Sequence, residues 1–239
     1  RNLYYALMGL ISLAVLFGVF YINVKRKNKK IERQRIVIAK EKERSEKLLL
    51  NIIPSSVAEE LKETGKSVPQ YYKEASVLFT DFSGFTQISE SLTPVELVNK
   101  LDEIFLEFDL IAERNGINRI KTIGDAYMCA AGIPEEDVNH AKNTVKAALE
   151  MRDFIDLFDL KLKPNEPKWN VRIGVNSGPV VAGVVGQRKF AYDIWGDAVN
   201  IASRMESSGE IGKVNVSEST YNILGNDFKF NYRGKIKAK

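Results

Sequence analysis

An uncharged apolar segment near the start of the chain limits most strongly what this protein can fold into. Residues 3–22 carry no charged side chain, and a basic cluster follows at once, made of Lys25, Arg26, Lys27, Lys29 and Lys30. A helix needs about 20 apolar residues to cross a bilayer, and flanking positive residues stay on the cytoplasmic side. A signal peptide would carry its positive charges before the apolar run, and a buried core helix is the other alternative. We expect residues 1–24 to cross the cell membrane and the remaining chain to be cytoplasmic.

The basic cluster is a local feature and not a property of the whole protein. Its five positive charges exceed the net charge of +4 of the 239-residue chain, so the rest is close to neutral. This distribution argues against a general nucleic-acid surface. The single cysteine, Cys129, excludes an intrachain disulfide framework and fits a packed thiol in an apolar strand. The single histidine, His140, disfavours a serine–histidine or cysteine–histidine nucleophile, and we expect it to be solvated at a helix start.

Residues 25–53 continue as a charged segment rich in good helix formers. A heptad pattern runs through them, formed by Ile31, Ile38, Ser45 and Ile52 with Gln34, Glu41 and Leu48 at the complementary position. Such a seam with polar members predicts a coiled-coil signalling helix that favours a dimer, and a single solvated helix is the alternative. Pro54 should end it.

Residues 54–73 are expected to form a transducer or linker segment. Ser55 and Ser56 followed by Glu59 predict the cap of a short helix through Lys62, which Gly65 stops. Because the chain begins with Arg1 instead of Met, we also expect further sequence upstream.

From Glu74 onward short apolar strands alternate with longer helices. A strand at 75–81, a helix from Pro94 to Gly116, a hairpin at 117–130 and a helix at 137–158 follow one another. Further strands are predicted at 169–176 and 180–185 around a turn at residues 177–179, then at 214–216 and 228–230, with a helix at 198–206. The β-α-ββ-α-β order predicts an α+β, ferredoxin-like (βαββαβ) sandwich over residues 74–239.

The hairpin carries two charges that its apolar surroundings do not explain. Gly124 and Asp125 form the tight turn, and Lys121 lies within the first strand. Asp81 ends an earlier strand that would neighbour the hairpin, and two adjacent carboxylates repel unless a cation lies between them. Two divalent ions bridged by carboxylates, about 3.5–4 Å apart, are a common device for displacement at phosphorus. The alternative is that Asp81 caps a helix and Asp125 is an ordinary turn residue.

Two further groups of residues suit a nucleotide. Phe82, Ser83, Gly84, Phe85 and Thr86 form a turn after Asp81 whose backbone N–H groups would suit phosphate. Asn200 and Arg204 are four residues apart and share one helix face. They would position a ribose oxygen and neutralise charge on a phosphate, or simply form a polar face in water.

These residues lie in segments that together resemble one family. Residues 79–86 (FTDFSGFT), 121–128 (KTIGDAYM), 178–186 (GPVVAGVVG) and 192–204 (YDIWGDAVNIASR) are similar, in sequence and order, to the class III adenylyl/guanylyl cyclases. The resemblance covers the chain from about Glu74 to its end. It implies a membrane-anchored adenylyl cyclase with one cyclase domain per chain, under an unknown upstream sensor.

The resemblance also implies a role for each residue. Asp81 and Asp125, with the Phe82 carbonyl, resemble the ligands of two divalent cations, Mg²⁺ or Mn²⁺. Lys121 and Asp193 look like the purine-reading pair, and Asn200 and Arg204 like the transition-state pair. The family works as a dimer in which the aspartates come from one protomer and the other residues from its partner. A homodimer would therefore have two equivalent sites.

Hydrogen bonding distinguishes the two purines. Adenine offers an acceptor at N1 and a donor at its 6-amino group, which match the donor Lys121 and the acceptor Asp193. Guanine reverses both groups, and a wrong base would leave buried polar groups unpaired. We therefore expect conversion of ATP to 3′,5′-cyclic AMP and pyrophosphate. The alternatives are a guanylyl cyclase and a non-catalytic nucleotide-binding dimerisation module.

The end of the chain departs from the family pattern. Residues 233–239 resemble the run before a Gly-Lys-Gly motif, which makes Lys239 an expected phosphate-binding residue. We expect the final strand of the domain to be absent. The basic tip at residues 187–189 is either a dimer arm or a solvated turn.

Overall fold

The computed structural model describes residues 2–50, 52–164, 166–186 and 190–235, in two compact units, Arg1–Ile53 and Pro54–Lys239. The predicted basic tip at 187–189 and the predicted phosphate ligand Lys239 lie outside the described residues.

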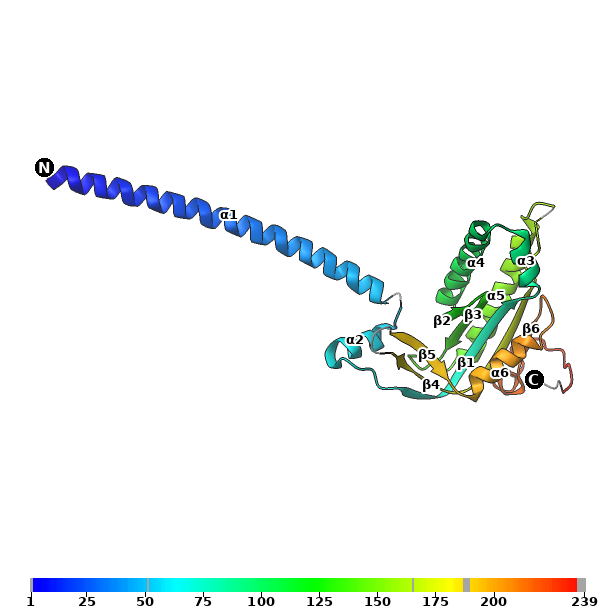
Figure 1. Cartoon of the computed structure of the whole chain (residues 1–239). Coiled ribbons are helices and arrows are strands. Elements are labelled where there is room, and N and C mark those ends of the chain that lie inside the picture. The colour runs from blue at the N-terminus through cyan, green and yellow to red at the C-terminus, as the bar shows by residue number, and fades with distance from the viewer. Residues whose placement is uncertain (1, 51, 165, 187–189, 236–239) are drawn as a thin grey trace. The chain divides into compact units, whose positions relative to one another are not determined.

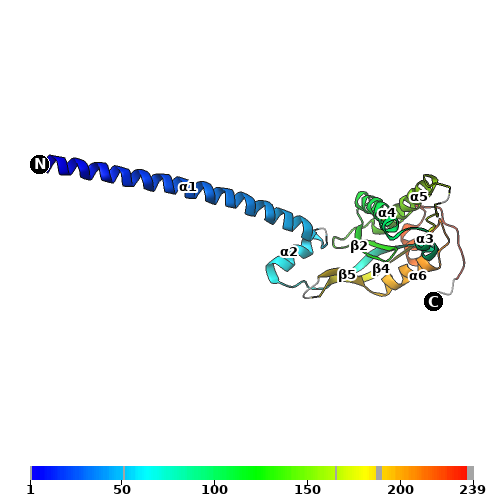
Figure 2. The same cartoon turned by 45° about the horizontal axis from the view of Figure 1, so that its top comes forward.

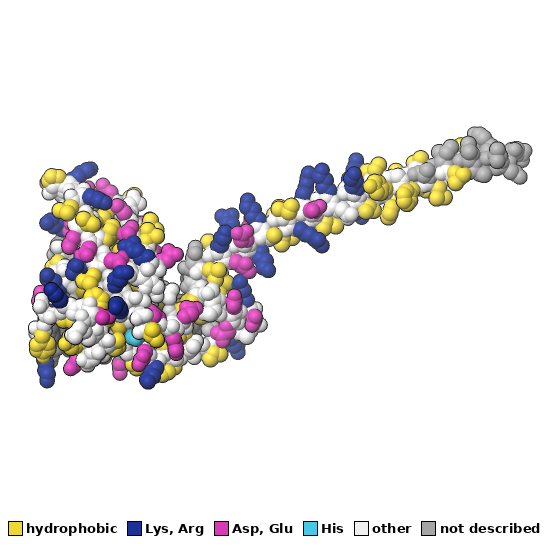
Figure 3. All heavy atoms as spheres, turned by 180° about the vertical axis from the view of Figure 1, so that it is seen from behind, with side chains coloured by type: hydrophobic (Ala, Val, Ile, Leu, Met, Phe, Trp, Pro, Cys, Tyr) yellow, Lys and Arg dark blue, Asp and Glu magenta, His cyan; other side chains and the backbone are white. Residues whose placement is uncertain are grey.

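The first unit is one continuous helix, α1 (Asn2–Leu50) (Figure 1). Hydrophobic side chains cover its described part before the basic cluster, and dark-blue basic side chains follow (Figure 3). Among the described residues, α1 is the one helix long and apolar enough to cross a membrane, which is weak evidence for a span. The helix ends at Leu50, so Ile52 of the predicted heptad seam lies beyond it. The coiled coil itself stays a prediction.

The second unit begins with a short helix, α2 (Ser55–Thr64), close to its predicted position. Its N-cap is Pro54, and no side-chain hydrogen bond caps it within the described residues, so the predicted Ser–Glu cap is wrong. Ser55 is already helical and therefore cannot serve as the flanking cap residue. The predicted stop is correct, because Gly65 ends the helix at φ 73°, a left-handed conformation that glycine adopts easily.

One sheet organises this unit, with strand order β2-β3-β1-β4-β5 and the short β6 (Val214–Val216) parallel to β4. Its other strands are β1 (Gln70–Phe82), β2 (Asn118–Ile123), β3 (Ala126–Ala131), β4 (Val171–Val185) and β5 (Ala191–Trp195). β1 is antiparallel to both of its neighbours, β3 and β4. The first four strands follow the predicted ferredoxin-like arrangement.

Helices cover both faces of the sheet (Figure 2). α4 (Pro94–Arg114) and α5 (His140–Leu160) pack on one face over Leu78, Cys129 and Ile173. α6 (Asp197–Ser207) covers part of the other face, where Ala198 and Ala202 contact a second buried cluster. The chain is completed by α3 (Phe85–Ser91) and α7 (Glu218–Leu224), neither of which was predicted. The expected packed thiol is confirmed, because Cys129 is fully buried in β3.

The predicted turn at residues 177–179 is wrong, because β4 runs through it as a single strand. Tyr72 pairs with Val180 and Ala75 with Gly178, so two residues of β1 face Pro179 alone. This is a β-bulge, a place where a strand tolerates a proline that has no N–H to donate. Pairing along the long β1 therefore overrides the local turn signal of Ser-Gly-Pro.

Two more expectations need correction near the second long helix and the chain end. α5 begins at His140 and not at 137, because the Asp137 carboxylate accepts hydrogen bonds from Asn139 N and Asn143 Nδ2, each at 2.8 Å. Residues 228–230 lie outside any strand of the described chain. Phe228 and Phe230 instead pack their rings against the main core.

His140 was expected to be solvated but is only 3% exposed. Its Nδ1 lies 2.8 Å from the Ser76 hydroxyl of β1, so a hydrogen bond accompanies the burial. Burial lowers the pKa of His140, and the nearby carboxylates of Glu74 and Asp137 oppose this effect only in part. The folded state therefore favours the neutral imidazole.

This burial predicts a pH-dependent stability. In the unfolded chain His140 binds a proton near the ordinary histidine pKa of about 6.5, whereas in the folded chain it binds one only at lower pH. The folded state is therefore fully stable, as far as His140 is concerned, above that pH. We expect the contribution of His140 to the free energy of unfolding to fall as the pH drops below about 6.5, by about 1.4 kcal/mol per unit of pKa difference. The difference in urea unfolding between the wild type and His140→Gln, followed across this range, measures it. A difference that does not change with pH would contradict the assignment.

Candidate active site

Two carboxylates meet at one end of the sheet. Asp81 lies near the end of β1, and Asp125 occupies the turn between β2 and β3, whose Gly124 has φ 64°. Since Thr80 pairs with Tyr127, the register brings the two aspartates together. Burial and the hydrogen-bonded Asp81 carboxyl raise the pKa of Asp125 to about 6, although the backbone N–H groups of Asp125 and Phe82 oppose the shift.

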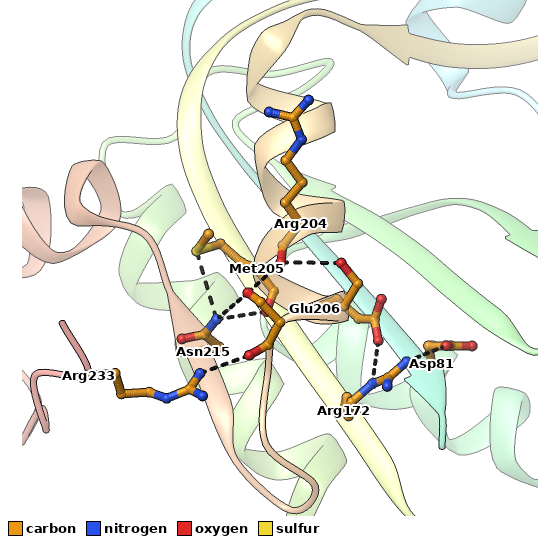
Figure 4. Close-up of polar contacts among 9 residues, drawn as sticks. Asp81, Arg172, Arg204, Met205, Glu206, Asn215 and Arg233 are labelled. Atoms are coloured by element: carbon orange, nitrogen blue, oxygen red, sulfur yellow. Dashed lines mark hydrogen bonds and ion pairs between the residues drawn. The ribbon is translucent and has the colours of Figure 1, made fainter. Parts of the chain in front are cut away.

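Arg172 and Glu206 extend this cluster, and neither was predicted from the sequence. Arg172 lies opposite Asp81 in the β1–β4 register, and its Nη2 donates to Asp81 Oδ2 at 2.9 Å (Figure 4). Its Nε donates to Glu206 Oε1, also at 2.9 Å. Burial raises the pKa of Glu206, while Arg172 opposes the rise. Arg172 is a charged residue inside the predicted apolar strand 169–176, as Lys121 is inside the hairpin. This pattern was the sequence signal that could have identified Arg172.

The donor set fits divalent cations that take further ligands from a bound molecule and from water. Among the described residues no group of three or more His, Cys, Asp or Glu side chains could hold a metal alone. Mg²⁺ commonly uses one or two carboxylates and completes its coordination with substrate phosphates and water. Burial and the neighbouring Asp81 carboxyl raise the pKa of Asp125, so a cation placed between the two carboxylates would favour the ionised form. Asp81 and Asp125, with the nearby Phe82 backbone, would therefore hold the ions.

The predicted phosphate-binding turn leads directly into α3. Gly84 is the N-cap residue at φ 78°, and Ser83 N donates to Asn170 O at 2.8 Å. Phe85 and Thr86 form the first helical positions, where N–H groups have no acceptor inside the helix. Phe82 packs its ring edge-on against Trp169, with 5.1 Å between the ring centroids, and this contact anchors the turn to the core.

Lys121 and Asp193 form an ion pair within one chain, although β2 and β5 stand at opposite ends of the strand order. The sheet curves enough for these two strands to contact each other. Asp193 also accepts from the Ile194 backbone N–H at 2.9 Å. Both charged side chains are partly exposed, so a ligand can reach them from solvent.

The hairpin that carries Asp125 and Lys121 is braced by α4. Asp109 accepts from the Tyr127 hydroxyl and from Arg119 Nη1, each at 2.8 Å. One carboxylate thus holds both strands of the hairpin against the helix. Burial raises the pKa of Tyr127, which therefore stays a neutral donor.

Asn200 and Arg204 lie on the exposed side of α6, whose buried side is formed by Ala198, Ala202 and Glu206. Within the described part of the chain neither side chain forms a hydrogen bond or ion pair, and the side-chain hydrogen bonds to Arg204 go to its carbonyl oxygen, from Ser208 Oγ at 2.6 Å and Ser207 Oγ at 3.4 Å. Figure 4 shows the Arg204 guanidinium pointing away from the Asp81, Arg172 and Glu206 group. Within one chain the predicted transition-state pair and the carboxylate pair are therefore not brought together.

The backbone of α6 packs unusually closely on β4. A Cβ added to Gly174 would lie 1.9 Å from the Glu206 backbone N, and one added to Gly178 would lie 3.3 Å from the Ala198 Cβ. At position 174 any residue other than glycine would place its Cβ against the α6 backbone and prevent this approach. The two glycines thus decide how near the helix that carries Asn200 and Arg204 can come to the sheet.

Comparison with known proteins gives a consistent family. Residues 67–239 match the adenylate and guanylate cyclase catalytic domain. An adenylate cyclase of Mycobacterium tuberculosis is 42% identical over 211 residues, which are 87% of this chain and 46% of the relative. Guanylyl cyclase C of Homo sapiens is 40% identical over 213 residues, 87% of this chain and 20% of that protein. The chain spans less than half the length of these relatives.

Solved structures share the fold. The catalytic core of a rhodopsin-guanylyl cyclase with converted specificity, in complex with ATPαS, has a TM-score of 0.64 and 38% identity, over 71% of this chain and 94% of that one. The guanylate cyclase domain from Catenaria anguillulae, in complex with GTP, has a TM-score of 0.63 and 38% identity, over 67% and 86%. The adenylyl cyclase CyaB from P. aeruginosa has a TM-score of 0.65 and 28% identity, over 72% and 89%.

The contact between α6 and β4 predicts a strong effect of one methyl group. Gly174→Ala would force the α6 backbone away from the sheet, and we expect a loss of about 3 kcal/mol in unfolding free energy. Gly178→Ala is the matched control, because its new Cβ meets only the Ala198 methyl group at 3.3 Å. Urea unfolding compares the two variants. Equal midpoints would show that the close approach is not a constraint.

Proposed function

This chain belongs to the family of the adenylate and guanylate cyclase catalytic domain, and on that premise we propose that it converts ATP to 3′,5′-cyclic AMP and pyrophosphate. The ion pair between Lys121 and Asp193 is the observation that supports ATP as the substrate. In the free chain these two side chains satisfy each other. Adenine would enter between them, with N1 accepting from Lys121 and the 6-amino group donating to Asp193.

Relatives that bind different purines support the idea that side chains, and not the fold, select the purine. The similar solved structures include one in complex with ATPαS and one in complex with GTP, so a shared fold is found with either purine. The guanine edge would present a donor to Lys121 and an acceptor to Asp193, which leaves both unpaired. A guanylyl cyclase is the second candidate because of the 40% identity to guanylyl cyclase C.

The chain's own residues divide the chemical work. Asp81 and Asp125 would hold two divalent cations, Mg²⁺ or Mn²⁺, and the turn from Phe82 to Thr86 would face the phosphates. When bound, the cations supply Lewis-acid chemistry, which lowers the pKa of the ribose 3′-hydroxyl and neutralises phosphate charge. Arg172 bonds Asp81 in the free chain, so bound cations would compete with its guanidinium for that carboxylate.

Asn200 and Arg204 would complete the reaction from the other protomer. Asn200 would orient the ribose for attack of its 3′-oxygen on the α-phosphorus, and Arg204 would stabilise the charge that develops there. Both lie on the exposed side of α6, and the Arg204 guanidinium points away from Asp81 of its own chain (Figure 4). A homodimer would therefore contain two equivalent sites, each with aspartates from one copy and α6 from the other.

Membrane attachment and control from upstream belong to the same proposal. The apolar part of α1 is followed by the basic cluster, the arrangement of a single span with a cytoplasmic catalytic unit. The helix continues without a break to Leu50, so a signal from an upstream sensor would reach the catalytic units through a paired stalk. A non-catalytic nucleotide-binding dimer is the remaining alternative, which a turnover assay separates.

Nucleotide preference tests the purine assignment. We expect the purified chain with Mn²⁺ to turn over ATP at least about 100-fold better than GTP in kcat/KM, because a mispaired buried edge discriminates strongly. Lys121→Glu should lower ATP turnover, since it replaces the donor for N1 with an acceptor. A chain that already prefers GTP would contradict the hydrogen-bond argument. No turnover of either nucleotide would favour the non-catalytic module.

Mixed dimers test the shared site. Asp125→Ala and Asn200→Ala should each reduce cyclic AMP formation to background as homodimers. In a mixed dimer one site receives both changes and the other receives neither, so about half of the wild-type activity should return. Two different affinity tags isolate the mixed dimer, and cyclic AMP is measured directly. If the mixed dimer forms no cyclic AMP although both variants are folded, the site is not shared in this way.

A further inference from the structure

The face of β4 beneath α6 carries a short pattern of three residues. Gly174, Asn176 and Gly178 are two positions apart, so their side chains lie on the same face of the strand. The glycines allow the α6 backbone to approach, as their close contacts with Glu206 and Ala198 show. Asn176 lies between them, and it is only 1% exposed.

The Asn176 amide links three elements. Its Nδ2 donates to the Ala198 carbonyl oxygen in the first turn of α6 at 2.9 Å. Its Oδ1 accepts from the Ser219 hydroxyl in the first turn of α7, also at 2.9 Å. Because a carbonyl oxygen can only accept, the nitrogen has to face α6. One buried side chain therefore joins β4 to the first turns of both helices.

This link supplies a restraint that the glycines cannot. Side chains that interlock resist the sliding and rotation of a packed helix, whereas glycine has no side chain that could interlock. A hydrogen bond is directional and weakens quickly with distance and angle. The bond at Ala198 therefore fixes the start of α6 on the sheet, two residues before Asn200.

We propose that Asn176 is a positioning residue for the reaction: its buried amide fixes α6 on β4 and so sets where Asn200 and Arg204 meet the nucleotide of the partner protomer. This inference rests on the proposed function, since it needs α6 to act on that nucleotide. Asn176 does not touch the substrate. A misplacement of about 1 Å at a reacting centre can cost about 100-fold in rate, so a small shift of α6 is sufficient.

Kinetics of the homodimer give the first test. Asn176→Ala should lower kcat about 10- to 100-fold. It should change the KM for ATP little, because the aspartates and the Lys121–Asp193 pair keep their places. Thr144→Ala is the matched control. Thr144 is also fully buried, and its hydroxyl bonds the His140 carbonyl at 2.7 Å on α5, away from α6.

The control separates positioning from general weakening of the fold. We expect both variants to lower the unfolding midpoint, but only Asn176→Ala to lower kcat. Equal effects of the two variants on kcat, or an unchanged kcat for Asn176→Ala, would overturn the proposal.

The mixed dimer gives the sharper test, because Asn176→Ala can be placed in either copy. In the Asp125→Ala copy it affects the α6 that serves the surviving site, and activity should fall about 10- to 100-fold. In the Asn200→Ala copy it affects an α6 that is already disabled, and activity should stay at the level of the parent pair. Equal losses for both placements would overturn the positioning role. If the parent pair itself is silent, the shared site fails, and the homodimer kinetics alone decide the role of Asn176.

Discussion

The hydrogen-bond register of β1 is the constraint on which the catalytic unit depends. Its pairing with β3 sets Thr80 opposite Tyr127, and its pairing with β4 sets Asp81 opposite Arg172. Because side chains alternate across a strand, a slip of one residue would turn Asp81 to the other face of the sheet. Both faces of β1 are packed, with Leu78 in one cluster and Val77 in the other. Any slip would disrupt the close packing of side chains in both cores, so the two cores hold the acid in place.

Charge balance connects this register to α6. Arg172 bonds both Asp81 and Glu206, so one guanidinium serves a carboxylate of the candidate metal site and one of the helix. The pKa of Asp125 is raised by its burial and by the neighbouring Asp81 carboxyl. In the proposed function this cluster would accept the cations, and Arg172 links α6 to it. In the proposed mechanism, this places the exposed face of the same helix where a second copy can use it.

Several parts of the fold could be predicted from the sequence. The hairpin turn at Gly124, the helix that begins at Pro94 and the ferredoxin-like order of the first strands depend on local conformation and on apolar periodicity, which neighbouring residues determine. The single strand through Pro179 and the burial of His140 could not be predicted. Each depends on a distant partner, the bulge in β1 or the hydroxyl of Ser76, and no local pattern records such a partner.

The sequence by itself determined the kinds of chemical group present and the elements that carry them: two acids at strand ends, a lysine in an apolar strand, and an amide and a guanidinium on one helix face. Only the tertiary structure decided which of these meet. It joins Asp81 to Arg172 and Lys121 to Asp193, and it turns the Arg204 guanidinium away from Asp81 of its own chain. The physical reason is that sheet curvature, strand register and the approach of α6 over Gly174 are set by packing between distant segments, to which each residue contributes only a small part of the free energy.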